Sequence, residues 1–196
     1  MTKPEKRRLF FALWPDSRVR ERIQEQANNA RADTDGRAVA ESNLHMTLAF
    51  LGSVPVDEIA ALRSASAGVR SDAFVLEIDR TGWWKKTGIL WLAPSAPSAG
   101  LNRLVQLLWS RLHPRGFKAD FHKFRPHVTI ARKCSHASSV DIEPVRWTVT
   151  NFALLESETH PKGARYTLLD HWPLNMGVNP DDATENGGCP DGQIVE

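Results

Sequence analysis

Two stretches of the chain share one pattern: Asn43-Leu-His-Met-Thr-Leu-Ala-Phe50 and Arg125-Pro-His-Val-Thr-Ile-Ala-Arg132. In each, a His-x-Thr triplet leads into an apolar residue and an alanine, and the two histidines stand 82 positions apart (127 − 45). One such triplet carries little weight in a chain with seven histidines. Two triplets in matching contexts predict an internal duplication, with halves related by an approximate two-fold axis.

The strand-like character of both stretches predicts where their polar side chains point. Residues i and i+2 of a β-strand face the same side, so His45 lies beside Thr47 and His127 beside Thr129. The apolar residues between them are expected to face the core. Across a two-fold axis, the two His-Thr pairs would face each other over a groove with room for one phosphate group.

This arrangement suits acid–base chemistry on a cyclic phosphodiester. An imidazole with an ordinary pKa near 6.5 can act as base or acid at neutral pH. One histidine can therefore take a proton from water while the other gives a proton to the departing ribose oxygen. The hydroxyls of Thr47 and Thr129 can bind the non-bridging oxygens, and Arg132 can offset the charge of the transition state. The alternative for Arg132 is a solvated surface position.

Hydrophobic periodicity predicts helices and strands around these motifs. Helices are expected after a cap at Asp16 or Ser17, over residues 57–68 and over residues 98–113. Strands are expected over residues 8–14, 44–51, 74–78, 88–93, 127–132, 145–156 and 165–172, with hairpins across 82–87 and 157–163. Residues 1–175 are assigned to one domain of two lobes, and residues 176–196 to a flexible acidic tail.

Alternation along the first strand separates its two faces. Leu9, Phe11 and Leu13 form an apolar face that belongs in the core, which turns Phe10 toward the cleft. There Phe10 could stack on a terminal base whatever its identity, since every base has a π-face. The alternative is a plain core position. A structural role is expected for Tyr166, the only tyrosine.

Charge and cysteine content narrow the class of protein. The chain has 196 residues and a formal net charge of +2; its last 21 residues hold five acidic and no basic groups, so the remainder carries 25 basic and 18 acidic groups, or +7. This excess favours a phosphate-rich partner. Cys134 and Cys189 form no CxxC or metal-type spacing, and the apolar run 9–14 is too short for a signal peptide or a membrane span. We expect a cytoplasmic protein without a membrane segment.

Four blocks of the sequence resemble the bacterial RNA 2′,3′-cyclic phosphodiesterases, also called 2′-5′ RNA ligases, of the two-histidine phosphoesterase superfamily. They are the motif stretches, extended to 43–52 and 124–132, with Arg-Leu-Phe-Phe-Ala-Leu at 8–13 and Arg-Tyr-Thr-Leu-Leu at 165–169. The resemblance covers about residues 8–174. It implies a bilobal α+β fold, with two antiparallel sheets around a central cleft and helices on the outside.

The resemblance also implies a reaction. It implies hydrolysis of 2′,3′-cyclic phosphate ends of RNA to 2′-phosphate ends without ATP or metal. We expect no other cofactor, a monomer, and an RNA partner that could be a tRNA fragment. It further implies an ability to join RNA ends through a 2′-5′ bond. Carried over by motif, His45 is the proton donor to the leaving 3′ oxygen and His127 the proton acceptor that activates water. The two motifs are nearly equivalent and do not by themselves decide that polarity.

Three alternatives stay open. A metal enzyme could use the histidine-rich stretch of His113, Asp120, His122, His127 and His136, although its spacing matches no metal-binding helix. A nucleotide- or RNA-binding module could keep the fold without turnover. A phosphodiesterase of the same fold could act on small cyclic nucleotides or on 2′-5′ oligoadenylates.

Overall fold

The computed structural model describes residues 5–96, 98–118, 124–160 and 163–176. Its helices are α1 (Ser17–Ala30), α2 (Ile59–Ala67) and α3 (Ala99–Leu112), with 3-10 turns at Glu41–Asn43, Val56–Glu58 and His113–Arg115. Its strands are β1 (Lys6–Leu13), β2 (Arg37–Ala38), β3 (Met46–Pro55), β4 (Phe74–Ile78), β5 (Arg80–Trp84), β6 (Ile89–Ala93), β7 (Val128–Arg132), β8 (Val145–Val149), β9 (Asn151–His160) and β10 (Gly163–Pro173). The predicted tail lies outside the described residues from position 177 onward.

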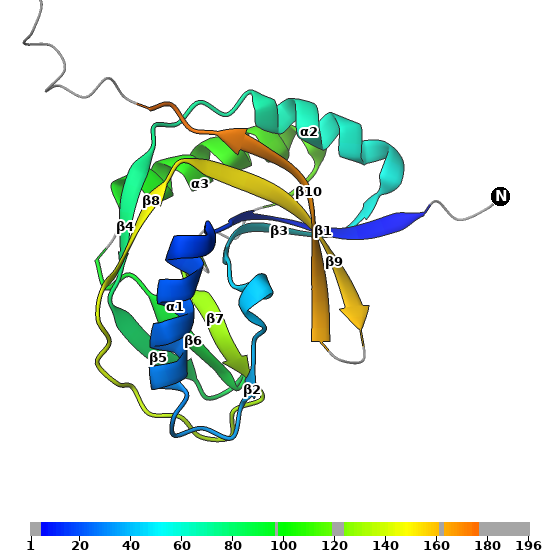
Figure 1. Ribbon diagram of the computed structural model, residues 1–196. Helices are drawn as coiled ribbons and strands as arrows, with labels where there is room; N and C mark the ends of the chain where they lie inside the picture. Colours follow the sequence, from blue (N-terminus) through cyan, green and yellow to red (C-terminus); the bar gives the residue numbers. More distant parts are fainter. Residues whose placement is uncertain (1–4, 97, 119–123, 161–162, 177–196) are drawn as a thin grey trace, which may run out of the picture.

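Antiparallel pairing builds one eight-stranded sheet and a separate two-stranded sheet. The large sheet runs β10-β9-β1-β3-β7-β6-β5, with β2 beside β7, and the small sheet pairs β4 with β8. The large sheet has two arms, β10-β9-β1-β3 and β7-β6-β5, which lie on opposite sides of the molecule (Figure 1). Within the described residues, these arms are joined by one register pair, Met46 with Val128. The predicted α+β class with two antiparallel sheets is confirmed.

Helices cover the outer sides of this framework (Figure 1). α2 and α3 pack on each other and on the first arm, whereas α1 lies along the second arm. The Asp16 carboxylate caps α1 by accepting from the Val19 N–H at 2.8 Å, and the Ser98 hydroxyl caps α3 by accepting from the Leu101 N–H at 3.2 Å. Such caps satisfy N–H groups that the first helical turn leaves unpaired. Among the described residues, no helix is long and apolar enough to cross a membrane.

The predicted hairpin across 82–87 is wrong in its bounds. Gly82 lies inside β5, and the turn spans residues 85–88, where Gly88 has a φ of 62°. β4 does not join this hairpin, because its buried Leu76 and Ile78 face the buried Trp147 and Val145 of β8. The strand predicted over 74–78 is confirmed as β4, but apolar alternation does not identify the strand with which it pairs.

The single strand predicted over 145–156 is also wrong. It divides at Thr150 into β8 and β9, which belong to different sheets. Burial alternates along β8 and becomes continuous from Phe152 to Leu155 in β9. β8 therefore covers the core with one face only, whereas the first half of β9 is enclosed on both faces. β9 and β10 then pair through much of the predicted 157–163 hairpin, as far as His160 and Gly163.

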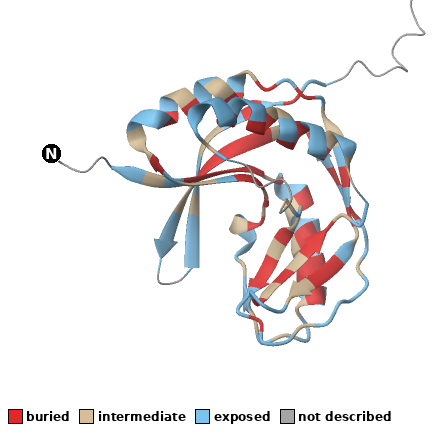
Figure 2. Cartoon of the chain, turned by 180° about the vertical axis from the view of Figure 1, so that it is seen from behind, coloured by how far each residue is buried: buried red, intermediate tan, exposed pale blue. Residues whose placement is uncertain are grey.

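The two faces of β1 belong to two separate apolar clusters. Leu9, Phe11 and Leu13 are fully buried in the main core beneath the helices, as predicted. Phe10 and Ala12 lie on the opposite face, in a smaller cluster with strand β9. Figure 2 shows the buried residues concentrated in the inner strands, and the outer half of the β9–β10 hairpin exposed.

A substitution at Phe11 tests the packing of the main core. Its ring packs against both Phe152 and Trp172, with centroid distances of 6.2 and 5.9 Å. Phe11→Ala is expected to lower the free energy of unfolding by about 3–5 kcal/mol, because it leaves a cavity among these rings. Urea unfolding followed by circular dichroism measures the change. The exposed Val75 is the control position, and Val75→Ala should change the same free energy by less than about 1 kcal/mol. An equal loss of unfolding free energy in both variants would contradict the assignment of Phe11 to the main core.

Candidate active site

The pairing of Met46 with Val128 brings the two His-x-Thr motifs together where the arms meet. His45 and His127 each stand immediately before their strand, β3 or β7. Continuing the antiparallel register by one residue sets His45 opposite Thr129, and His127 opposite Thr47. Met46 and Val128 are fully buried, whereas the four polar side chains stay partly exposed. The four therefore share one face of the sheet, as strand parity predicts.

Both imidazoles are held by the backbone in the same way. His45 Nδ1 lies 2.6 Å from the Asn43 carbonyl oxygen, and His127 Nδ1 lies 2.7 Å from the Arg125 carbonyl oxygen. A carbonyl oxygen only accepts, so each Nδ1–H donates and the neutral ring keeps its lone pair on Nε2. Nε2 is therefore the atom of each ring that can take or give a proton during a reaction.

A β-bulge follows each His-Thr pair at the same position. The register of β3 against β1 leaves out Leu48, and the register of β7 against β6 leaves out Ile130. Each stands three residues after its histidine. A bulge re-aims the residues beyond it, so Phe50 and Arg132, five residues after their histidines, turn toward the same face as the threonines. These shared features support the predicted duplication, which stays a prediction.

One pocket opens at His45. It has a volume of about 290 Å³, and Thr47, Phe50 and Arg132 are among its lining residues. The Arg8 guanidinium lies over the Phe50 ring, 5.2 Å from its centroid. Among the described residues, those that line the pocket at His45 include two arginines and no carboxylate. A negatively charged group is therefore favoured here.

A second pocket opens at His127. It has a volume of about 430 Å³. The Trp84 ring meets the His127 ring edge-on with centroids 4.6 Å apart, and Trp91 stands 5.6 Å from Trp84. The two histidines thus each line a separate pocket. Thr129 faces Trp91 across the β6–β7 ladder and lines neither pocket.

Burial and a nearby cation set the protonation of both rings. The pKa of His45 is lowered to about 4, chiefly by burial; the hydrogen bond to the Asn43 carbonyl opposes this shift, and the charges of Arg132 and His127 add to it. Burial also lowers the pKa of His127, with Arg132 adding to the shift and the Arg125 carbonyl opposing it. Both imidazoles are therefore mainly neutral at pH 7 in the free protein. The influence of Arg132 on both rings places this cation close to both.

Phe10 faces the cleft side of the sheet, as predicted, but its side chain is only 3% exposed. Its ring packs 5.1 Å from His45 and 5.0 Å from Tyr166, and Tyr166 meets His45 edge-on at 5.0 Å. Both aromatic rings thus support the imidazole. Base stacking by Phe10 stays a prediction.

Phe50 is a site residue that sequence reasoning missed. Its side chain is 54% exposed and lines the pocket at His45. A signal was present, because Phe50 follows His45 at the same distance at which Arg132 follows His127. Aligning the two motifs over their full length would have selected it.

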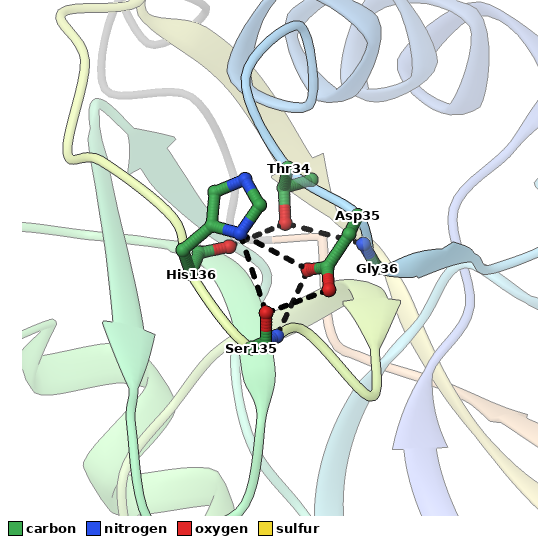
Figure 3. Close-up of polar contacts among 5 residues, drawn as sticks. All are labelled: Thr34, Asp35, Gly36, Ser135 and His136. Carbon is green, nitrogen blue, oxygen red and sulfur yellow. Dashed lines mark hydrogen bonds and ion pairs between the residues drawn. The ribbon is translucent and has the colours of Figure 1, made fainter.

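The histidine-rich stretch does not form a metal cluster within the described residues, of which Asp120 and His122 are not part. Figure 3 shows the contacts of His136: its Nδ1 lies 3.5 Å from Asp35, whose carboxylate also accepts from the Ser135 hydroxyl at 2.7 Å. The Ser135 hydroxyl also lies 3.3 Å from His136 Nδ1, but its shorter contact is with the Asp35 carboxylate. Histidine Nδ1 faces both serine and carboxylate, so the set lacks the order of a nucleophile–base relay, in which the two ring nitrogens serve the two partners separately. It fastens the loop before β2 to the loop after β7.

Comparison with known proteins gives a consistent result. The family model described as the 2′-5′ RNA ligase superfamily matches residues 15–161. The RNA 2′,3′-cyclic phosphodiesterase of Escherichia coli (strain K12) is 34% identical over 178 residues, which cover 90% of this chain and 100% of the relative. A protein of the same name from Thermus thermophilus is 31% identical over 198 residues, covering 94% of this chain and 99% of the relative.

Solved structures agree with the sequence matches. The crystal structure of E. coli LigT complexed with 3′-AMP superposes with a TM-score of 0.77 at 35% identity, covering 88% of this chain and all of that one. LigT complexed with phosphate gives a TM-score of 0.74 at 34% identity, with 88% and 99% coverage. The fold of the present chain therefore matches that of these proteins over most of its length.

Removal of the Arg132 charge tests its effect on the pKa values of the two histidines. Arg132→Gln is expected to raise the pKa of both His45 and His127, because the cation disfavours a second positive charge nearby. Titration of the imidazole resonances by NMR measures both values in the free protein. Arg115→Gln, an exposed arginine at the far end of α3, should leave them unchanged. Unchanged or lower pKa values of the two histidines in Arg132→Gln would contradict the placement of Arg132 beside both rings.

Proposed function

The chain belongs to the 2′-5′ RNA ligase superfamily and hydrolyses RNA 2′,3′-cyclic phosphates, and we propose that it does so by moving protons through His45 and His127. The single observation that carries this proposal is the matched donation of both Nδ1–H groups to backbone carbonyls. It supports Nε2 as the reactive atom in both rings. Two such atoms beside one phosphate meet the needs of an acid–base pair.

The reaction proceeds by in-line displacement at phosphorus. A water oxygen attacks the phosphorus atom while His127 Nε2 takes the proton of that water. The bond from phosphorus to O3′ breaks, and His45, protonated on Nε2, gives its proton to O3′. The products are a 2′-phosphate and a free 3′-hydroxyl. His127 then gives its proton to water and His45 takes one from water, which returns both histidines to their starting states.

Three further side chains stabilise the phosphate. The hydroxyls of Thr47 and Thr129 donate to the non-bridging oxygens, and Arg132 offsets the charge gathered in the transition state. Thr47 and Arg132 line the pocket at His45, which supports this assignment. Arg132 has a second effect, because its charge lowers the pKa of the proton donor. The bound phosphate anion acts in the opposite direction and favours the protonated form of His45.

The remaining parts of the proposal concern the working form of the protein. A single chain supplies both histidines and both pockets, which supports a monomer acting on RNA ends. Every residue with a proposed role lies within residues 1–175, so we assign catalysis to that domain and none to the tail. The Cys134 thiol is free and buried. This supports a cytoplasmic location, because thiols stay reduced there.

Replacement of either histidine tests the mechanism. His45→Ala and His127→Ala are each expected to lower kcat/KM on a short RNA with a 2′,3′-cyclic phosphate end by roughly 10²- to 10⁴-fold, since each removes one proton-transfer group. Product formation is followed by chromatography in the presence of EDTA. The exposed His113, replaced by alanine, is the control and should keep the parent rate. Parent activity in both site variants would refute the mechanism, and turnover of cyclic mononucleotides alone would favour a small-molecule substrate.

The pH dependence follows from the two lowered pKa values. The active protein carries one proton on the histidine pair, and this form is most populated between the two pKa values. Both lie below the ordinary 6.5 in the free protein, so kcat/KM should be greatest on the acid side of pH 6.5 and fall as the pH rises through neutrality. Rates measured across this range test the sign. A maximum above pH 7 would show that the free histidines are not the titrating groups.

A further inference from the structure

A third aromatic ring lies against His45. Trp14 directly follows strand β1, and its indole is stacked on the imidazole, with ring centroids 6.0 Å apart and planes inclined by 25°. The surroundings of His127 differ, since the Trp84 ring meets that imidazole edge-on, at 70°. Of these two contacts, only the one at His45 lays an aromatic ring nearly parallel to the imidazole. The two histidines are therefore held differently, although their motifs are alike.

The side chain of Arg20 holds the Trp14 ring from helix α1. Its guanidinium carbon lies 5.1 Å from the centre of the indole, within the range of a cation–π contact. The same guanidinium donates to the Pro15 carbonyl oxygen at 2.8 Å, in the link between β1 and α1. Arg20 therefore secures both the aromatic ring and the backbone that follows it.

A second hydrogen bond joins Arg20 to the turn that holds His45. The guanidinium donates to the carbonyl oxygen of Glu41 at 3.3 Å, and this residue begins the 3-10 turn Glu41–Asn43. At the end of the turn, the Asn43 carbonyl oxygen accepts from His45 Nδ1 at 2.6 Å. One guanidinium thus reaches His45 by two routes, through an aromatic ring and through the backbone.

The surroundings of Arg20 suit an internal role. It lines neither the pocket at His45 nor the pocket at His127. Burial lowers the pKa of Arg20, although the charges of Glu41 and Asp16 raise it. A cation that loses part of its hydration needs fixed partners, and two carbonyl oxygens and an indole supply them. An effect of Arg20 on the reaction is therefore expected through the residues that it holds.

We propose that Arg20 is a positioning residue, which keeps Nε2 of His45 aimed at the leaving O3′. The hydrogen bond at Nδ1 fixes one edge of the imidazole, and the Trp14 ring opposes tilting of its plane. Arg20 secures both constraints. Proton donation needs them, because a displacement of about 1 Å at a reacting group can cost roughly 10²-fold in rate. The inference rests on the proposed function, since it takes His45 as the proton donor.

Removal of the guanidinium tests the inference. Arg20→Met keeps the length of the side chain and removes its charge and its donors. We expect kcat on a short RNA with a 2′,3′-cyclic phosphate end to fall on the order of ten-fold, since the displacement is smaller than about 1 Å. KM should stay unchanged, because Arg20 lines neither pocket. Titration by NMR should show a higher pKa for His45, which loses part of its cover, and the parent pKa for His127.

Matched variants separate the two routes from a general effect of charge. Arg18 is an exposed arginine on the same helix, so Arg18→Met should keep the parent kcat and both histidine pKa values. Trp14→Phe keeps an aromatic ring beside His45, whereas Trp14→Leu does not. We therefore expect the phenylalanine variant to retain the higher kcat.

A double variant distinguishes positioning from general stabilisation of the fold. Once His45→Ala has removed the residue that is positioned, adding Arg20→Met should cost no further activity. The inference is overturned by parent kcat in Arg20→Met, by equal kcat in the two Trp14 variants, or by a further loss of the same size in the double variant. Parent activity in His45→Ala alone would instead refute the proposed function.

Discussion

The pairing of Met46 with Val128 is the contact on which the active site depends. It is the register pair that joins the two arms of the large sheet, and both side chains are fully buried. Because neighbouring residues of a strand face opposite sides, burying these two turns His45, Thr47, His127 and Thr129 to the other face. A single contact in the ladder therefore holds four polar side chains side by side. The arms separate beyond it, and this separation leaves room for a cleft.

Backbone geometry, repeated in both motifs, prepares the two histidines. A carbonyl two residues earlier fixes each ring, so no second side chain is needed to choose the tautomer. The bulge after each threonine then brings the residue five positions beyond the histidine to the cleft face. At this shared position, one motif offers the aromatic ring of Phe50 and the other the cation Arg132. The same backbone geometry thus presents two chemically different side chains, an aromatic ring and a cation, at equivalent positions of the two motifs.

The electrostatic state of the site links binding to protonation. Burial and Arg132 keep both imidazoles mainly neutral in the free protein, yet the proposed mechanism needs one of them charged. A phosphate anion supplies the opposing charge when it binds. By linkage, protonation of His45 and binding of the phosphate must strengthen each other to the same degree. In the proposed mechanism, His45 is therefore charged mainly when a substrate is there to receive its proton.

The sequence by itself selected the residues to which we assign the reaction and predicted the faces they occupy. His45 and His127, with their threonines, followed from a repeated pattern and from strand parity, because both are local properties of the chain. The helices followed for the same reason, from apolar spacing and from caps such as Asp16.

Only the tertiary structure decided which strands pair and which side chains enclose the histidines. Alternation along β4 predicted a strand but could not choose β8 as its partner, because many strands offer an apolar face. The sequence predicted Arg132 beside the phosphate, but strict alternation from Val128 would put it on the core face of β7, and the bulge at Ile130 turns it toward the other face. The pocket with Trp91 and Arg80 likewise depends on a register between strands. Pairing, bulges and pockets are long-range properties, set by packing between segments far apart in the chain.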